Sequence, residues 1–536
     1  PLWSRGLGDV YKRQVLATVT VSSCSDDKFE GFYENPAKTT QATCDHLMTG
    51  AFWNGNDYTF NKYWRMYTWD NIFGKYAQTI GYKNNTGSDY YYNDGYVNDR
   101  WANFYKILAQ YRQLENKYNA LSDANKENNR IYKDLTEIFV YDHLAQMCDL
   151  FGDVPFTKAG MIGITGDLAG SRAPFDNDED LYKMMIENLG TIYKDLEHYK
   201  ASGTAMVKAT LIAQDFINKG NIDKWLAYAN SLRLRMAVQV SLKGSLTAFG
   251  QAAVKECMGR TLVTDDAKGI EVISDKDGFN FWEDFRNGFK DINNVASQPM
   301  IDAMTKLGEA DQDPRLKVMY SANKDGKYIG TNRSEKNAFQ EANGSKFNGF
   351  GEKEWKDRYY AALDSATYTD NQLMVSPIVT AAEVDFLQAE AIQRGWAQGN
   401  AEQAFVNGMV NSSKFYYREN NMYASAKGKH YTYPGDDVVK AYATRLWASY
   451  TDKLDAILTM KWVHFGIFQA TQAWTSIRRT GYPMLTYPTD TDAKDIKDLP
   501  NRIKYPNSTK ASNKQNYDAV VATQGDKSET KLFWAK

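Results

Sequence analysis

Residues 181–196 read LYKMMIENLGTIYKDL, and apolar side chains recur along this stretch at spacings of 4, 4, 3 and 4. These side chains are Leu181, Met185, Leu189, Ile192 and Leu196. An α-helix brings residues three and four apart onto one face, so the stretch predicts an amphipathic helix whose apolar stripe faces a core. A second stripe follows in the chain, formed by Trp225, Ala229, Leu232, Met236 and Val240.

The same periodicity continues outward along the chain, whereas strong two-residue alternation is scarce. Further stripes cover 101–114, 132–147, 384–394 and 455–471. Several predicted helices come in pairs, 99–119 with 129–150 and 178–199 with 205–242, the last interrupted near Gly220. Pairs of this length resemble tetratricopeptide stacking, although no clean 34-residue consensus is present. The sequence predicts an all-α fold of stacked, tetratricopeptide-like helical pairs within residues 37–536.

Residues 255–375 differ from the rest, because they are rich in Gly, Asn, Asp and aromatic residues and have poor helical periodicity. A stretch of this length without regular elements is usually functional or disordered, and its aromatic residues argue against disorder. We therefore expect a loop-rich insertion at about 255–375. Regular helices resume at Ala381 and end near Arg479.

Composition narrows the function. The formal net charge is −2 and charged residues are well mixed, which gives no electrostatic reason to expect nucleic acid as a partner. Aromatic residues make up 14% of the chain; most are expected to pack a helical interior, and a surplus on loops would need a functional reason. The four cysteines, which form no CxxC pair, predict neither a zinc site nor a disulfide scaffold.

The N-terminal region ends in a lipoprotein-like pattern. Residues 15–23 form a short run of apolar and small residues before Cys24, and Ser25-Asp26-Asp27 follow. This run is too short to span a bilayer and resembles the end of a bacterial lipoprotein signal, with Cys24 as the lipidated residue. Residues 1–14 do not fit a signal start and are interpreted as foreign sequence, so 1–23 is a signal remnant and 24–36 a tether. A plain buried cysteine after a frayed terminus is the alternative for Cys24.

Several short motifs follow one another along the body of the chain. They are FGDVPF at 151–156, ANSLRLR at 229–235, DPRL at 313–316, AEVDFLQAEA at 382–391, MKW at 460–462, RRTGYP at 478–483 and RIKYP at 502–506. In this order, behind a lipoprotein-like cysteine, they resemble the SusD/RagB family of nutrient-binding outer-membrane lipoproteins, in its SusD-like branch. Met460 departs from the Gln that the family often has there, which affects only local packing.

The resemblance implies a function without catalysis. It implies a lipid-anchored protein at the bacterial cell surface that captures oligosaccharides and hands them to a SusC-like TonB-dependent outer-membrane transporter. No cofactor, metal or nucleic acid is implied, the membrane being contacted through the lipid anchor only. Starch-like, host-glycan, plant-glycan and peptide ligands all stay open.

The family motifs also carry charged residues that an enzyme could use. Glu383 and Glu390 lie seven apart on one predicted helix face, as an acid–base pair would. The alternative is that neighbouring arginines satisfy both carboxylates, and we favour this structural role. Arg478 and Arg479 could bind an anionic ligand, but the family resemblance implies that they belong to the scaffold. His143 and His464, both in predicted helices, are interpreted as packed residues.

Two aromatic-rich stretches are candidates for ligand binding, since an aromatic ring can stack on the apolar C–H face of a sugar. The first covers 52–69 and the second begins at 277. Candidate residues are Trp53, Trp64 and Trp69 in the first stretch, and Phe281, Trp282, Trp355 and Tyr359 in the insertion. The alternative for Trp64 and Trp69 is that they plug the first helix into the core. Residues 275–278 faintly resemble a calcium loop but lack the downstream ligands of an EF-hand.

Enzyme signatures are missing from the sequence. No GxSxG, HExxH, Walker A or Rossmann glycine pattern is present, and no two of the five histidines are spaced as a metal pair. The main enzyme alternative is an all-α glycoside hydrolase, which needs two carboxylates about 5–10 Å apart. A protein-interaction scaffold without a small ligand is the third possibility.

Overall fold

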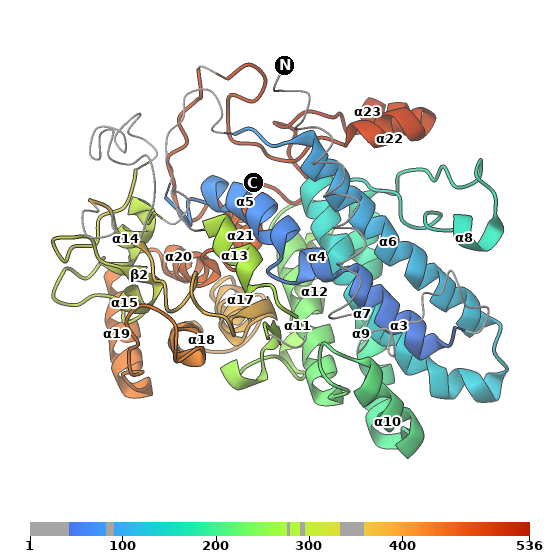
Figure 1. The fold of residues 1–536 in the computed structure, drawn as a ribbon, viewed down its shortest axis with the longest axis horizontal. Helices are drawn as coiled ribbons and strands as arrows, with labels where there is room; N and C mark the ends of the chain where they lie inside the picture. Colours follow the sequence, from blue (N-terminus) through green and yellow to red (C-terminus); the bar gives the residue numbers. More distant parts are fainter. Residues whose placement is uncertain (1–41, 82–89, 276–278, 290–294, 333–358, 492) are drawn as a thin grey trace, which may run out of the picture.

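A computed structural model describes residues 42–81, 90–275, 279–289, 295–332, 359–491 and 493–536 (Figure 1). Most of these residues are helical, and the predicted all-α class is confirmed. The expected signal remnant at 1–23, the tether at 24–36 and Cys24 lie outside the described residues.

The first half is a stack of long helices in which consecutive elements contact one another. Its helices are α3 (Cys44–Asn54), α6 (Asp94–Asn119), α7 (Asp123–Phe151), α9 (Asp178–Ser202), α11 (Ile222–Val240) and α12 (Thr247–Met258). The side chain of Asn177 accepts the backbone N–H groups of Glu179 and Asp180, which starts α9. The five apolar residues of the 181–196 stripe are all buried, as predicted.

The predicted interruption near Gly220 is confirmed. Helix α10 (Ala205–Gln214) ends before Asp215, and α11 begins at Ile222. Gly220 has a positive φ of 72°, and the carboxylate of Asp215 accepts backbone N–H groups of the turn together with Nε1 of Trp225 at 2.6 Å. A glycine with positive φ and a buried capping carboxylate therefore separate the two helices.

The second half is built from α17 (Ala381–Gln393), α18 (Ala401–Met422), α19 (Asp436–Ser449), α20 (Lys453–Phe465) and α21 (Ala470–Thr480). Helix α17 contacts α11 and thereby joins the two halves. The apolar stripe predicted over 455–471 is divided between α20 and α21. Helix α20 ends before Gly466, whose φ is 46°. A Cβ atom at this position would lie 2.7 Å from the Tyr416 hydroxyl oxygen. Periodicity cannot reveal such a break, because apolar residues continue across it.

Short elements fill the predicted insertion. They are η2 (Asp266–Lys268), β1 (Ile270–Ile273), α13 (Trp282–Phe289), α14 (Gln298–Met304), α15 (Leu316–Met319), β2 (Tyr320–Ser321), β3 (Ala362–Leu363) and β4 (Val375–Val379). Strands β1 and β4 pair antiparallel, with Ile270 opposite Val379 and Ile273 opposite Val375, and β2 pairs with β3. Among the described residues of this region, loops separate these short elements, and β1 and β4 bring its two ends together.

The remaining elements are α4 (Asn56–Thr59), η1 (Tyr63–Asp70), α5 (Asn71–Tyr76), α8 (Ile162–Thr165), α22 (Asn507–Ser512) and α23 (Lys514–Thr523). Helix α5 packs on α21, where the rings of Phe73 and Trp474 stack with centroids 4.7 Å apart. This contact places η1 between the two halves of the molecule. In the part of the chain that the structure describes, no helix is both long enough and apolar enough to cross a membrane.

Candidate ligand-binding face on η1

Helix η1 is a π-helix of eight residues with one exposed and one buried side. Lys62 precedes it in an extended conformation. Tyr63 and Tyr67 are 38% and 39% exposed, whereas Trp69 and Asp70 are buried. Two tyrosines four residues apart therefore face solvent from one rigid element.

The exposed rings form an ordered cluster. The rings of Tyr63 and Tyr67 stack with centroids 4.9 Å apart and an interplanar angle of 13°. Half-buried Trp64 contacts Tyr63 edge to face at 5.3 Å and reaches Tyr96 of α6 at 6.1 Å. Burial raises the pKa of Tyr96, and the adjacent Tyr63 hydroxyl adds to that rise. We call Tyr63, Trp64 and Tyr67 the η1 face.

Buried polar contacts hold η1 from its inner side. The Arg65 guanidinium donates to the carbonyl oxygens of Thr59 and Phe468, both at 2.6 Å, and pairs with Asp70 at 3.1 Å. Asp70 also accepts from the Thr471 hydroxyl at 2.9 Å. Burial raises the pKa of Asp70, and the positive charge of Arg65 opposes the rise. These bonds fix the helix to α21 and to the chain just before it.

Helix α13 packs beside η1 and brings the second aromatic stretch next to the first. The Asp284 carboxylate accepts the backbone N–H of Tyr63, and burial raises the pKa of Asp284. Below the surface, the ring of Phe60 lies 4.8 Å from Phe279 and 5.8 Å from Phe281. The two stretches that the sequence singled out thus form one region of the fold.

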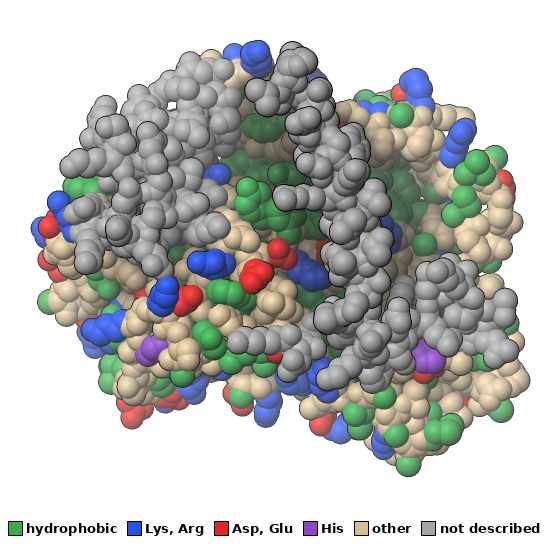
Figure 2. All heavy atoms as spheres, viewed as in Figure 1, with side chains coloured by type: hydrophobic (Ala, Val, Ile, Leu, Met, Phe, Trp, Pro, Cys, Tyr) green, Lys and Arg blue, Asp and Glu red, His purple; other side chains and the backbone are tan. Residues whose placement is uncertain are grey.

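Charged and polar side chains surround the aromatic rings. Lys62 Nζ donates to Asn56 Oδ1 at 2.6 Å, lies 3.6 Å from an Asp57 oxygen and sits 5.6 Å from the centroid of the Trp53 ring. In Figure 2, hydrophobic side chains gather near the centre of this view, over α5 and α13, with acidic and basic side chains beside them. Such a surface offers flat apolar faces together with hydrogen-bond partners.

The seven predicted ligand residues have different environments. Trp53, Trp64 and Trp282 are half-buried, and Trp282 Nε1 donates to the Thr369 carbonyl oxygen at 3.1 Å. Trp69 and Phe281 are buried in the core, at 3% and 0% exposure, so neither presents a ring to a surface ligand. Tyr359 is 40% exposed and contacts Tyr360 edge to face. Trp355 lies outside the described residues.

Sequence reasoning named the run that contains Tyr63 and Tyr67 but treated it as a loop, and chose only its tryptophans. The signal for these tyrosines was their spacing of four residues, which puts both rings on one side of a helix. That residues 63–70 form a continuous helix was not predicted from the sequence.

The structural role favoured for Glu383 and Glu390 is confirmed. Arg235 binds Glu383 through two bonds of 2.6 and 2.8 Å. Arg479 binds Glu390 in the same way, at 2.8 and 2.6 Å, and Lys461 lies 3.5 Å away. Burial raises the pKa of Glu390, but the charges of Arg479 and Lys461 outweigh it and hold that pKa well below its usual value. Such a carboxylate stays ionised and cannot serve as a general acid.

The other charged candidates are also part of the scaffold. Arg478 donates to the carbonyl oxygens of Asp149 and Asn501, both at 2.8 Å. His464 lies between the hydroxyls of Thr380 and Ser412 at 2.7 and 3.0 Å, and burial lowers its pKa to about 3. His143 is buried as well. Among the described residues, no three His, Cys, Asp or Glu side chains could hold a metal ion, and three residues of the calcium-like loop fall outside that set.

Comparison with known proteins assigns the family. The SusD-like family, described as starch-binding and associating with the outer membrane, matches residues 36–506. No protein of curated function matches the sequence. Among solved structures, a chitin-binding protein superposes with a TM-score of 0.70 at 19% identity, over 92% of this chain and 100% of its own.

Two further structures agree with this assignment. A SusD homologue from Bacteroides fragilis gives a TM-score of 0.68 at 17% identity, covering 92% of this chain and 100% of the other. A chitin-binding SusD homologue from Flavobacterium johnsoniae gives 0.63 at 19% identity, covering 91% and 98%. At these identities the superpositions show a shared fold, and the family match extends over most of the chain. The chain therefore belongs to the SusD-like family.

Proposed function

We propose that this protein captures oligosaccharides on the η1 face and catalyses no reaction on them. The observation that carries the proposal is the pair of stacked, exposed tyrosines beside Trp64 on an element fixed from within. Sugar rings have apolar C–H faces, which stack on aromatic rings, and hydroxyl edges, which bond to carboxylates, amides and ammonium groups. Asp57, Lys62 and Asp284 supply such groups beside the rings.

The fixed geometry of η1 supports binding without catalysis. Because Asp284 holds η1 at Tyr63 and Thr471 holds it at Asp70, the rings need little ordering when a ligand arrives, which lowers the entropic cost of binding. The names of two structural neighbours, both chitin-binding, support a polysaccharide fragment as the ligand class. Glu383 and Glu390, the carboxylate pair in the sequence, are both occupied by arginines.

The proposal includes delivery at the cell surface. Lipidation of Cys24 would tether the protein to the outer membrane, and the SusD-like assignment supports a SusC-like TonB-dependent barrel as the partner. Tethering beside a transporter raises the local ligand concentration over the pore, because the transfer becomes effectively intramolecular. Replacing Cys24 with Ala should move the protein from the membrane fraction to the soluble fraction and leave its helical circular dichroism unchanged. Retention in the membrane fraction would contradict the anchor.

Calorimetric titration of the chain from Ser25 onward against a panel of oligosaccharides, with product analysis of each mixture, tests the capture role. We expect heat of binding with at least one glycan and no cleavage products. Cleavage would favour the glycoside hydrolase alternative. If no glycan of the panel gives heat of binding, a peptide ligand or a protein-interaction scaffold would be favoured.

Variants then locate the site. Tyr67→Ala should weaken binding about tenfold, since loss of one stacking ring removes roughly 1.4 kcal/mol. Tyr359→Ala tests the competing location, because Tyr359 is equally exposed at 40% but lies in the insertion. Trp282→Ala and Trp355→Ala test the remaining insertion residues. If Tyr359→Ala or Trp355→Ala weakens binding and Tyr67→Ala does not, the site lies in the insertion instead.

A further inference from the structure

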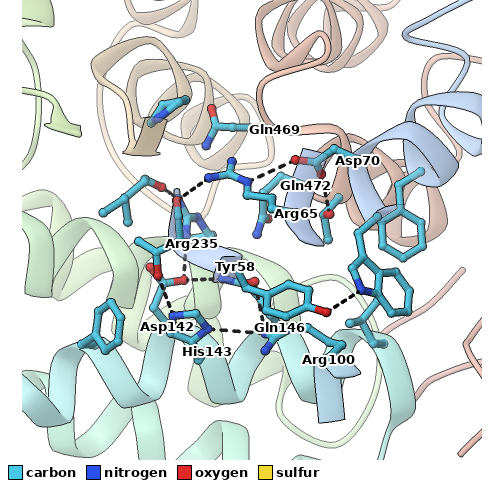
Figure 3. A pocket seen from close by; sticks show the side chains of 18 of the residues that line it. Tyr58, Arg65, Asp70, Arg100, Asp142, His143, Gln146, Arg235, Gln469 and Gln472 are labelled. Carbon is cyan, nitrogen blue, oxygen red and sulfur yellow. Dashed lines mark hydrogen bonds and ion pairs between the residues drawn. The ribbon is translucent and has the colours of Figure 1, made fainter. Parts of the chain in front are cut away.

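A polar cavity of about 60 Å³ lies on the inner side of η1, between that helix, α6, α7 and α21 (Figure 3). Asp142, His143 and Gln146 of α7 lie on one side with Arg100 of α6, and Arg65 and Gln472 face them across the space. Because a cavity needs about 10–15 Å³ per water molecule, this one has room for a few waters or one small ion. Its lining lies on the buried side of η1 and does not include the exposed rings of Tyr63 and Tyr67, so it is distinct from the η1 face.

Two of the three arginines that line the cavity form ion pairs with carboxylates. Arg65 binds Asp70 and donates three further hydrogen bonds, to oxygens of Thr59, Ser376 and Phe468. Arg235 binds both carboxylate oxygens of Glu383 and lies 3.5 Å from Asp142. Their charges are therefore balanced within the protein.

Arg100 is different. Its side chain is buried at 2% exposure, and its guanidinium lies over the Tyr58 ring at 4.8 Å. Nη2 has only long contacts, 3.5 Å to His143 Nδ1 and 3.4 Å to Gln146 Oε1, and Nη1 has no hydrogen-bond partner among the described residues. Burial lowers the pKa of Arg100 to about 10, so the side chain stays charged near neutral pH.

No described carboxylate forms an ion pair with Arg100, although the charges of Asp142 and Asp99 act on its guanidinium from a greater distance. The Thr59 hydroxyl donates to the Gly55 carbonyl oxygen, so the 2.9 Å contact between Thr59 and His143 places the proton on Nε2 of a neutral imidazole. Asp142, the nearest carboxylate on α7, accepts the Tyr228 hydroxyl at 2.6 Å and the Gln146 amide at 3.2 Å, besides facing Arg235. Water could satisfy the Nη1 hydrogen bond, whereas an anion would also place a negative charge in direct contact with a buried guanidinium that has no described ion-pair partner of its own.

We propose that this cavity binds one small monovalent anion, of the size of chloride, at Nη1 of Arg100. The carboxylates of Asp70 and Asp142 work against an anion, and each already accepts bonds from its own arginine or hydroxyl partners. A second cavity of about 20 Å³ shares Asp142, Gln146, Arg235 and Gln472 with the first. Gln146 and Gln472 are only half-buried, which gives an ion a polar route from solvent.

Bromide is the probe, because it replaces chloride and scatters anomalously at the bromine absorption edge. Crystals of the unaltered protein grown in sodium bromide should show an anomalous peak within about 3.5 Å of Arg100 Nη1, at hydrogen-bonding distance for a large anion. Ordinary water density at that position without an anomalous peak would overturn the proposal. This measurement needs no variant and no glycan, so its outcome is independent of the proposed function.

Thermal unfolding gives a second readout. At equal ionic strength, the midpoint should be higher in chloride or bromide than in gluconate, which is too large for the cavity, because a ligand that binds only the folded state stabilises it. Arg100→Gln should abolish this difference, whereas Arg445→Gln, at an exposed arginine paired with Asp311, should keep it. Equal midpoints of the unaltered protein in all three salts would contradict the proposal. If Arg100→Gln fails to fold, the bromide crystal decides.

Discussion

In α17, Glu383 and Glu390 lie seven residues apart and are bound by arginines, whereas in η1, Tyr63 and Tyr67 lie four residues apart and expose their rings to solvent. Both pairs are the kind of side chain that glycan chemistry uses, carboxylates for hydrolysis and rings for binding. The carboxylates are saturated by Arg235 and Arg479, and the rings keep an open side. Availability of a group, rather than its chemical type, therefore distinguishes the scaffold from the proposed site in this molecule.

The largest expected effect is a loss of stability on breaking the ion pair between Glu390 of α17 and Arg479. Glu390→Gln leaves Arg479 buried without its counter-charge, which costs about 3–5 kcal/mol in the free energy of unfolding. Urea denaturation measures this loss. Glu197→Gln, at an exposed position of α9, is the matched control and should change stability by less than about 0.5 kcal/mol. A small loss in Glu390→Gln would mean that α17 is less essential to the scaffold than its contacts indicate.

Removing both rings of η1 should lower glycan affinity and leave the stability of the fold nearly unchanged. The double variant Tyr63→Ala and Tyr67→Ala should lose roughly 2 kcal/mol of glycan binding free energy, about thirtyfold in affinity, because both stacking surfaces disappear. Its unfolding midpoint should change little, since both side chains are more than one-third exposed. Calorimetry and urea denaturation on the same sample separate the two effects. Unchanged affinity would remove η1 from the site.

The free energy of unfolding should depend on pH through the buried His464, which belongs to the scaffold and not to the η1 face. Burial lowers the pKa of His464 to about 3 from 6.5, so between these values the unfolded chain binds a proton that the folded chain does not. Stability contributed by the neutral ring is therefore full above pH 6.5 and is lost as pH falls toward 3, by roughly 2 kcal/mol at pH 5. His464→Asn should flatten the pH profile between 7 and 5. An identical slope in the variant would exclude this histidine as the cause.

The smallest expected effect probes the contact between α13 and η1. A Cβ atom added at Gly288 would lie 3.2 Å from the Tyr67 Cα, so Gly288→Ala must displace one helix slightly. Overpacking of this kind costs about 1 kcal/mol of stability, and we expect glycan affinity to fall severalfold as Tyr67 shifts. Gly308→Ala cannot serve as the control, because Gly308 has a positive φ of 101° and an alanine there would strain the backbone. Ala303→Gly in α14 offers a comparable change of one methyl group away from η1. Equal affinities in both variants would show that binding tolerates movement of Tyr67.

Much of the fold could be predicted because helical periodicity is local information. The stripe at 181–196 fixes α9, and Gly220 marks the start of α11. The break at Gly466 was not predictable in this way, because the apolar pattern continues through it and only the approach of Tyr416 shows why glycine is needed. For the site, the aromatic content identified both segments. Burial of Trp69 and Phe281, with exposure of Tyr63 and Tyr67, depends on tertiary contacts between distant parts of the chain.

The anchoring of η1 has a consequence for how the protein is made. Arg65 reaches the Phe468 carbonyl oxygen across 403 residues of sequence, and Asn61 donates to the Val375 carbonyl oxygen across 314. Contacts of such separation close late in folding, because the entropic cost of a long loop must be met before they form. The first half of the chain can build its helices while η1 still lacks its support. Glycan capture should therefore be among the last properties to appear during biogenesis, and a chain that binds glycan is one whose two halves have already docked.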